Sequence, residues 1–531
     1  MLANHWSERM TMTTGRTQRR CRSRVALAAI LGCLSAVSAR AQEPFPGLDA
    51  YITKAMADWK MPGLAVAIVR NDSVLWAKGY GVRTFGGNDR VDDKTLFEIG
   101  SSSKSFTATI VAMLVSDGKM RWDDRLTNYL PTFQLQDPVA NAEVTIRDAL
   151  THRAGLTRAE LSWMYAGISR DEVLRRVRFL KPAYPFRSRW NYQNVMFAAA
   201  GEAAAKAATT TWEELIQRRI FEPLGMATSL PLAPKNRSGI ANLATPHATR
   251  RDTVYTLAPM WMDNVAPAGS IISTAHDMAQ YLRFQLGDGM FNGKRLVSAA
   301  ALRQTHTPQM LMAGGEGGGG GEGDSLTRFS TYGMGWMVQD YRRNLMWQHG
   351  GNTDGMTTAM GMLPDSKFGV VVLSNMYGAQ LPSVLMRYIF DRQLGVPVRD
   401  LSAEALTRVA TQRRRADSTE RAQAALRVAG AQPPLPLSAY AGSYADSLYG
   451  EATVSETDGK LVMQRGDLSA PLEYWNANNF RWGRLQSAAI SSLFVKFDVA
   501  PDGKVTSLSF GLGPDTAYMA RKAPPRAASR P

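Results

Sequence analysis

Strand-like patterns at both ends of a long region, with helical patterns between them, constrain the fold of this chain most. Apolar runs near 63–69 and 74–81 predict the two strands of a hairpin. Strand patterns return only from residue 332, whereas residues 145–310 mostly show the spacing of amphipathic helices. This order predicts an α+β domain, in which segments far apart in the chain share one antiparallel sheet beside a helical region.

The same patterns give the individual elements of this first domain, which we assign to residues 42–395. Helices are predicted at 48–60, about 101–116, 145–150, 170–179, 194–207, 212–220, 274–286 and 380–394. The later strands are predicted at 333–339, 344–349, 357–363 and 370–375.

The composition changes after this domain. Residues 396–435 are rich in Ala, Arg and Glu and contain Pro433-Pro434, which indicates a helical linker. Residues 436–522 hold short alternating runs, two pairs of which are joined by Asp-Gly turns at 458–459 and 502–503. They predict a small all-β domain, a barrel or a sandwich, and residues 523–531 form a basic tail.

The first 41 residues have the pattern of an export signal. Five arginines between residues 16 and 24 precede the apolar run 25–37, and Ala39 and Ala41 are small residues before a cleavage site at Gln42. The run is too short to span a bilayer, and no other stretch is long and apolar enough. We therefore expect an exported protein, periplasmic or secreted. A lipoprotein-like sequence ending in Cys33 is the alternative.

Cysteine content and charge exclude several classes of site. Cys21 and Cys33 both lie in the predicted signal, so the exported chain would have no disulfide, thiolate nucleophile or cysteine metal site. Residues 1–41 carry +6 of the formal charge of +16. The other basic clusters lack interleaved aromatic residues, so no nucleic-acid partner is expected. The six histidines have no ligand spacing, and we expect neither a metal nor another cofactor.

Ser101 and Lys104 are the candidate nucleophile and base. They begin a predicted helix directly after a strand-like run, and one helical turn puts them on the same face. A serine hydroxyl becomes a strong nucleophile when a neutral amine takes its proton, and both the helix dipole and burial disfavour the ammonium form. A second Ser-x-x-Lys, from Ser116 to Lys119, is interpreted as accidental because Gly118 breaks the helix between its members.

Two further motifs follow in order, Tyr192-Gln193-Asn194 at a helix start and His349-Gly350-Gly351 at a strand end. With the segments 150–156, 268–275 and 332–336, they resemble the serine β-lactamase and penicillin-binding-protein family, in its class C, esterase and D-aminopeptidase branch. The resemblance covers about residues 48–395 and implies a β-lactamase/transpeptidase-like fold. The C-terminal domain resembles the small lipocalin-like domain appended to some of these hydrolases.

The resemblance implies a role for each matching residue. Ser101 would be the acylated nucleophile. Lys104 and Tyr192 would remove its proton and protonate the leaving group, with nearby cations drawing the pKa of the tyrosine well below its free value of about 10. Asn194 would contact the substrate and Lys104. The backbone N–H groups of Ser101 and Asn352 would form the oxyanion hole.

The third motif departs from the pattern of many relatives. His349, a further candidate catalytic residue, stands where they have the lysine of Lys-Thr-Gly, and Gly351 belongs to the candidate substrate and oxyanion-binding residues. His-Gly-Gly lacks the fixed cation and the hydroxyl that bind a β-lactam carboxylate. It therefore favours an esterase or D-peptidase over an efficient β-lactamase. His152, in the segment 150–156, is expected to be a hydrogen-bonded structural residue.

The predicted activity is metal-independent hydrolysis of an ester or amide through an acyl-serine intermediate, on a small-molecule or peptide substrate such as a peptidoglycan fragment. Two alternatives stay open. One is a non-catalytic binding protein of the same fold, and the other is a β-lactam sensor, which would need a membrane anchor such as a lipidated Cys33. Residues 313–324, almost all Gly and Glu, predict a flexible surface loop. The sequence leaves the oligomeric state open.

Overall fold

The structure, a computed structural model, describes residues 43–523 apart from 234–236, 238, 251, 313–326, 428–429, 484, 486, 491 and 513–514. The predicted export signal, the glycine-rich loop at 313–324 and the basic tail from residue 524 lie outside the described residues.

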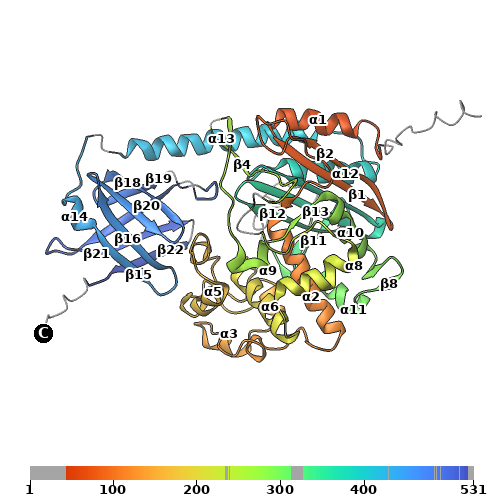
Figure 1. The fold of residues 1–531 in the computed structure, drawn as a ribbon, viewed down its shortest axis with the longest axis horizontal. Helices are drawn as coiled ribbons and strands as arrows, with labels where there is room; N and C mark the ends of the chain where they lie inside the picture. The colour runs from red at the N-terminus through yellow and green to blue at the C-terminus, as the bar shows by residue number, and fades with distance from the viewer. Residues whose placement is uncertain are drawn as a thin grey trace, which may run out of the picture. The chain divides into compact units, whose positions relative to one another are not determined.

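The first domain has the following elements (Figure 1). Its main strands are β1 (Gly63–Arg70), β2 (Ser73–Gly81), β9 (Met310–Leu311), β10 (Ser330–Tyr332), β11 (Met337–Tyr341), β12 (Asn344–Thr353), β13 (Met356–Leu363) and β14 (Phe368–Ser374). Its helices include α1 (Leu48–Asp58), α2 (Ser103–Ser116), α4 (Ile146–Leu150), α5 (Arg170–Arg176), α6 (Asn194–Ala207), α7 (Trp212–Ile216), α9 (Ala266–Gly269), α10 (Ala275–Leu286), α11 (Ala299–Thr305) and α12 (Leu381–Gln393).

The two ends of the domain share one antiparallel sheet, as the order of patterns predicts. Its strand order is β2-β1-β14-β13-β12-β11-β10-β9. β1 pairs with β14 so that Leu64 lies opposite Ser374. The predicted α+β class and its β-lactamase/transpeptidase-like architecture are therefore confirmed.

Both faces of the sheet are buried. Successive side chains of β1 point to opposite faces, and every residue of the strand up to Val69 is buried. Leu64 and Val66 pack in one core cluster with residues of α1 and α12. Ala65 and Ala67 pack in the other with residues of α2 and α10. The sheet thus lies between a thin helical layer and the larger helical region, whose helices α2, α6 and α9 carry the candidate site.

The expected strand at 333–339 is wrong at its start. Residues 333–336 form a turn, and β11 begins only at Met337. Gly335 has a φ of +75°, and a Cβ there would lie 2.7 Å from the carbonyl oxygen of Lys104. The turn therefore needs glycine to pack directly against the backbone of α2.

The C-terminal domain is a closed barrel rather than a sandwich. Its eight strands are β15 (Gly442–Asp446), β16 (Gly450–Thr457), β17 (Lys460–Arg465), β18 (Leu468–Asn476), β19 (Asn479–Gly483), β20 (Ser492–Val499), β21 (Val505–Leu512) and β22 (Asp515–Arg521). β15 closes the barrel by pairing with β22. The sequence patterns missed β18, which contains Pro471, and β22, whose first residue is the buried, charged Asp515.

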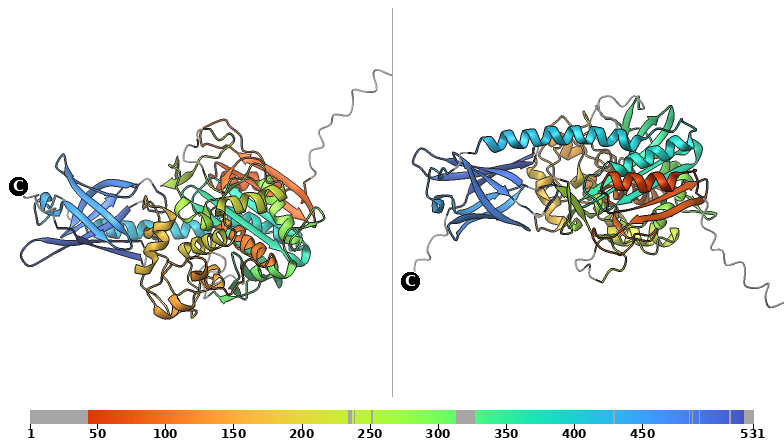
Figure 2. Two further views of the ribbon diagram at one scale, coloured as in Figure 1. Left: turned by 60° about the horizontal axis from the view of Figure 1, so that its bottom comes forward. Right: turned by 90° about the horizontal axis from the view of Figure 1, so that it is seen from above.

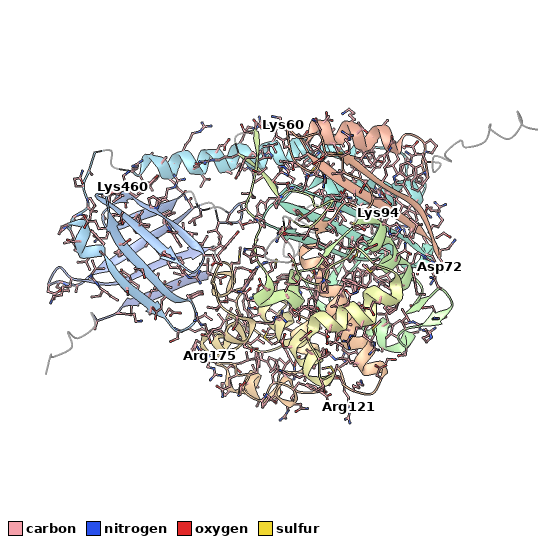
Figure 3. The ribbon with its side chains drawn as sticks, in the orientation of Figure 1. Lys60, Asp72, Lys94, Arg121, Arg175 and Lys460 are labelled. Atoms are coloured by element: carbon pink, nitrogen blue, oxygen red, sulfur yellow. The ribbon has the colours of Figure 1, made fainter. Side chains whose placement is uncertain are left out.

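A long helix, α13 (Leu401–Ala425), precedes the barrel (Figure 2). Its start is fixed at the end of α1, because Nε1 of Trp59, the residue after α1, donates to Ser402 Oγ at 2.9 Å. The arginine run at 413–415 is exposed on this helix. Figure 3 shows further charged side chains at the outside of the molecule, all of them exposed: Lys60, Asp72, Lys94, Arg121, Arg175 and Lys460. Among the helices of the described ranges, none combines the length and apolar character that crossing a membrane requires.

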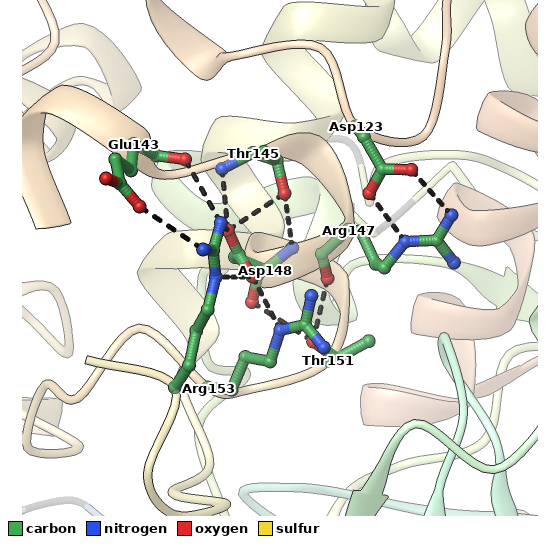
Figure 4. A network of polar contacts seen from close by, with 8 residues as sticks. Asp123, Glu143, Thr145, Arg147, Asp148, Thr151 and Arg153 are labelled. Carbon is green, nitrogen blue, oxygen red and sulfur yellow. Dashed lines mark hydrogen bonds and ion pairs between the residues drawn. The ribbon is translucent and has the colours of Figure 1, made fainter. Parts of the chain in front are cut away.

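A buried carboxylate ties α4 to the segment that leads into the Tyr192 motif (Figure 4). Asp148 is completely buried and accepts hydrogen bonds from Thr145 N–H at 2.9 Å, Arg153 Nε at 2.5 Å and Arg187 Nη2 at 2.8 Å. The backbone N–H of Arg187 also donates to the carbonyl oxygen of Arg153 at 2.8 Å. Asp148 therefore joins the start of α4 to the two chain segments that carry Arg153 and Arg187.

Replacing Asp148 by alanine should lower the free energy of unfolding by about 3 kcal/mol, because it removes the carboxylate half of the capping box with Thr145 and leaves two arginines without their buried partner. Denaturant unfolding followed by circular dichroism measures this. The matched control is Asp123→Ala, which breaks the more exposed pair of Asp123 with Arg147 and should cost less than about 1 kcal/mol. Equal losses in the two variants would contradict the role given to Asp148.

Candidate functional site

Ser101 lies in a tight connection between a strand and a helix. The short strand β3 (Phe97–Glu98) pairs with β6 (Ile272–Ser273), and the 3₁₀ turn Gly100–Ser102 then leads into α2. Ser101 is partly exposed, whereas the residues that follow it in α2 are buried up to Leu114. The local fold therefore presents one hydroxyl at the surface end of a buried helix.

Lys104 is fully buried one turn further along. Its Nζ lies 3.1 Å from Ser101 Oγ, 2.7 Å from Asn194 Oδ1 and 2.7 Å from the carbonyl oxygen of Ala268. The two carbonyl-type oxygens can only accept, so the lysine donates a hydrogen to each of them. A neutral amine then has its lone pair left to face the hydroxyl of Ser101.

Electrostatics favour this neutral amine. Burial lowers the pKa of Lys104 well below its ordinary value of 10.5. The negative charge of Glu160 opposes the shift, and the positive charge of Arg158 adds to it. The free amine, the form that can accept a proton, is thus accessible far below the pH at which an exposed lysine would lose its charge.

Tyr192 contacts the same serine oxygen. Its hydroxyl lies 2.6 Å from Ser101 Oγ. Burial raises the pKa of Tyr192 above its ordinary value of 10.0, although the hydrogen bond to Ser101 and the charge of Arg158 work against this shift. The expectation of a depressed tyrosine pKa is therefore wrong, because desolvation of the phenolate outweighs the nearby cations. Tyr192 is a neutral phenol around pH 7.

His152 fixes the position of the Tyr192 motif and is a structural residue, as predicted. Its Nδ1 accepts the backbone N–H of Gln193 at 3.0 Å, and its ring centroid lies 4.4 Å from that of Tyr192. Burial lowers the pKa of His152 well below 6.5, so the ring is neutral.

Asn194 is held on both sides of its amide group. Its Oδ1 accepts from Lys104, and its Nδ2 lies 3.3 and 3.2 Å from the two carboxylate oxygens of Glu160. Because a carboxylate can only accept, Glu160 fixes which end of the amide faces the lysine. Glu160 also pairs with Arg158 Nη2 at 2.8 Å, and the guanidinium lies 4.8 Å from the ring centroid of Tyr192.

The sequence patterns did not identify Arg158 and Glu160. The available signal was a charged pair two and four residues after Leu156, where the segment 150–156 ends. Only the packing of this segment against α6 shows that the pair faces Tyr192 and Asn194.

Strand β12 lies directly against the Ser101 turn. A Cβ on Gly351 would lie 1.8 Å from the carbonyl oxygen of Ile99 and 3.0 Å from the backbone nitrogen of Ser101. A Cβ on Gly100 would lie 2.7 Å from the backbone nitrogen of Asn352. Only glycine fits at both positions, and the predicted oxyanion-hole nitrogens therefore belong to two backbone segments in direct contact.

His349 lies behind the site and not on the serine. Its Nδ1 lies 2.6 Å from the carbonyl oxygen of Gly350, to which it must donate, and its Nε2 lies 3.1 Å from the hydroxyl of Tyr332. Burial, with a contribution from Lys104, lowers the pKa of His349 to about 3. The histidine is thus neutral. It hydrogen-bonds to Gly350 and Tyr332, whereas Lys104 and Tyr192 are the groups that hydrogen-bond to Ser101.

The part of the chain with described coordinates holds no group of three or more His, Cys, Asp or Glu residues arranged for a metal ion. The chemistry that the arrangement offers is that of a nucleophilic serine, a neutral amine and a neutral phenol that share one oxygen atom.

Sequence comparison places this geometry in a known family. The family model described as Beta-lactamase matches residues 48–392, and that of a domain of unknown function, DUF3471, matches residues 426–523. The unguisins hydrolase ungD of Aspergillus violaceofuscus is 29% identical over 449 residues, which cover 78% of this chain and 77% of the relative. Penicillin-binding protein 4 of Amycolatopsis lactamdurans is 27% identical, with 59% of this chain and 81% of that protein covered.

Solved structures give the same fold. The octameric penicillin-binding protein homologue from Pyrococcus abyssi superposes with a TM-score of 0.58 at 19% identity, over 89% of this chain and 99% of that one. The class C β-lactamase from Rhodobacter sphaeroides has a TM-score of 0.52 at 21% identity, over 68% and 99%. With the family match over residues 48–392, these likenesses show that the chain belongs to the β-lactamase family and has its serine hydrolase fold.

Proposed function

We propose that this protein is a metal-independent serine hydrolase that cleaves an ester or amide bond through an acyl-Ser101 intermediate. The observation that carries the proposal is the threefold contact of the Lys104 amine with Asn194, Ala268 and the serine hydroxyl. Two of these partners accept hydrogens, so a neutral amine has only its lone pair left for the third. This is the arrangement that a general base needs.

In the proposed reaction, Lys104 takes the hydroxyl proton while Ser101 Oγ attacks the carbonyl carbon of the substrate. The N–H groups of Ser101 and Asn352 stabilise the negative charge that develops on the carbonyl oxygen. Tyr192, a neutral phenol on the serine oxygen, gives its own proton to the departing alcohol or amine as the bond to the carbonyl carbon breaks. The proton held by Lys104 then restores the phenol and leaves the amine neutral again. Water then attacks the acyl-enzyme with the same groups in reverse, which releases the acid and restores Ser101.

The substrates that we propose are esters and D-amino-acid peptides, including peptidoglycan-derived ones, rather than β-lactams. A neutral His349 supplies no fixed cation for a β-lactam carboxylate at the third motif. The relative named unguisins hydrolase supports hydrolysis as the activity. We also propose that the enzyme acts after export, in the periplasm or outside the cell, which rests on the sequence pattern of residues 1–41.

The Ser101→Ala variant should lose all labelling by a fluorophosphonate probe, because the probe phosphonylates an activated serine oxygen. Intact mass spectrometry reads the added mass, and hydrolysis of p-nitrophenyl esters should fall by at least about 1000-fold. The matched control is Ser116→Ala, which removes the serine of the second Ser-x-x-Lys and should leave both measurements unchanged.

The proposed activity would be refuted by a wild-type protein that reacts with neither a fluorophosphonate nor penicillin and hydrolyses no ester in a substrate panel. The non-catalytic binding protein would then be the better description, and Ser101→Ala would retain its biological activity.

The rate of fluorophosphonate labelling should fall at low pH, since the reaction needs the neutral amine of Lys104. We call this fall the acidic limb of the pH profile. Below the pKa of Lys104 the amine is protonated and the rate falls. The charge of Glu160 raises this pKa, so Glu160→Gln should move the acidic limb to lower pH. The rate constant for fluorophosphonate labelling, measured from pH 4 to pH 9, gives the shift.

The control for this pH profile is Glu172→Gln, the same change at a carboxylate that pairs with Arg175 and Arg176 on α5. Its profile should match that of the wild type. A limb that stays in place in Glu160→Gln, or moves to higher pH, would contradict the assignment of Lys104 as the base.

A further inference from the structure

Two strand ends of the C-terminal barrel reach the segment that carries Glu160. The 3₁₀ turn Glu160–Ser162 follows Arg158 in the chain and supplies the carboxylate that orients Asn194. It receives one contact from the start of β22 and another from the end of β17. Both contacts come from charged side chains that are almost fully buried.

The first contact is made by Asp515, which is 4% exposed. Its Oδ2 accepts the backbone N–H of Glu160 at 2.9 Å. An N–H group in the first turn of a helix has no partner within the helix, so a carboxylate from outside completes it. Asp515 thus does for this turn what a capping residue does for a longer helix, but from another domain.

The second contact is made by Arg465, which is 2% exposed. Its Nη2 donates to the carbonyl oxygens of Leu161 and Tyr449, the former in the turn and the latter in the barrel. The next barrel residues continue the contact, since the N–H of Asp467 donates to the carbonyl oxygen of Tyr165 at 2.9 Å. Donors and acceptors from the barrel therefore hold this segment on both sides.

The conformation of the turn explains why it needs such support. Ala159, directly before Glu160, has φ 46° and ψ 43°, the left-handed region that side chains with a Cβ disfavour. A residue keeps this conformation only where its surroundings impose it. The bonds of Asp515 and Arg465 to the following two residues are such a constraint.

The barrel also reaches the β12–β13 turn on the other side of the proposed oxyanion hole. Asp354, two residues after Asn352, accepts the N–H of Ala489 at 2.9 Å and the hydroxyl of Tyr165. The barrel thus contacts the chain next to Asn352 as well as the chain that carries Glu160.

We propose that the barrel completes the active site, with Asp515 as a positioning residue: by holding the backbone of Glu160, it keeps the Glu160 carboxylate on Asn194 and the Asn194 oxygen on the Lys104 amine. This inference rests on the proposed hydrolase function. It gives the domain of unknown function a task in catalysis, namely to fix the orientation of an amide that would otherwise be free to turn and present its NH₂ group to the lysine.

The test is the Asp515→Ala variant of the full chain. Fluorophosphonate labelling of Ser101 should slow by about 10-fold, since a small displacement of catalytic groups is costly. For an ester substrate, kcat should fall more than KM rises. The acidic limb of the labelling rate should move to lower pH, as in Glu160→Gln, because the carboxylate that raises the Lys104 pKa has left its position. A loss of barrel stability alone would not move this limb.

Two matched variants separate positioning from folding. Asp515→Asn keeps an oxygen acceptor for the Glu160 N–H and should label within about threefold of the wild-type rate. Asp498→Ala removes another barrel carboxylate, which bonds Ser507 and Lys496 within the barrel, and should leave rate and pH profile unchanged. The double variant Glu160→Gln/Asp515→Ala should label much less than 10-fold more slowly than Glu160→Gln alone, because Asp515 acts through the carboxylate of Glu160.

The positioning role of Asp515 is overturned if Asp515→Ala labels at the wild-type rate with an unmoved limb, if Asp498→Ala is equally slow, or if the effects of Asp515→Ala and Glu160→Gln multiply. An unreactive wild type would instead remove the proposed hydrolase activity. Hydrogen exchange then still decides whether the barrel holds the turn. Faster exchange of amides 160–162 in Asp515→Ala supports the contact, and unchanged protection overturns it.

Discussion

The burial of the Lys104 amine beside a serine hydroxyl is the constraint on which the rest of the site depends. An amine can be kept in an apolar interior only if it is neutral or if its charge is compensated. Here the required acceptors come from Asn194 on α6 and Ala268 on α9. Three helices must therefore pack to fixed positions around one nitrogen atom, and the sheet behind them supplies the surface on which they do so.

The sequence was sufficient for the architecture because apolar spacing reports burial directly. The β1 and β14 patterns are continuous apolar runs, typical of strands covered on both faces, and the structure pairs them. The patterns failed where a tertiary contact requires a residue that local strand propensity disfavours. The expected strand at 333–339 begins late because the turn at Gly335 packs on α2. β18 and β22 contain a proline and an aspartate, which strand propensity disfavours.

For the candidate site, ordered motifs predicted which residues come together but not their protonation. Ser101, Lys104, Tyr192 and Asn194 converge, and each lies within two residues of the start of α2 or α6. The direction in which the pKa of Tyr192 shifts depends on desolvation, which no sequence motif encodes. The sequence motifs do not identify Arg158, Glu160 and Asp515, for a related reason. Their partners lie tens to hundreds of residues away in the chain, and only tertiary packing brings them together.

The closure of the barrel has a consequence for the order of events during protein synthesis. β15 cannot find its last neighbour until β22 has left the ribosome, because the two strands pair across the full length of the domain. β22 also begins with Asp515. On the proposed role of that residue, the nascent hydrolase domain can fold first yet reaches full activity only when the final strand is in place, so that a truncated chain would be a folded but slow enzyme.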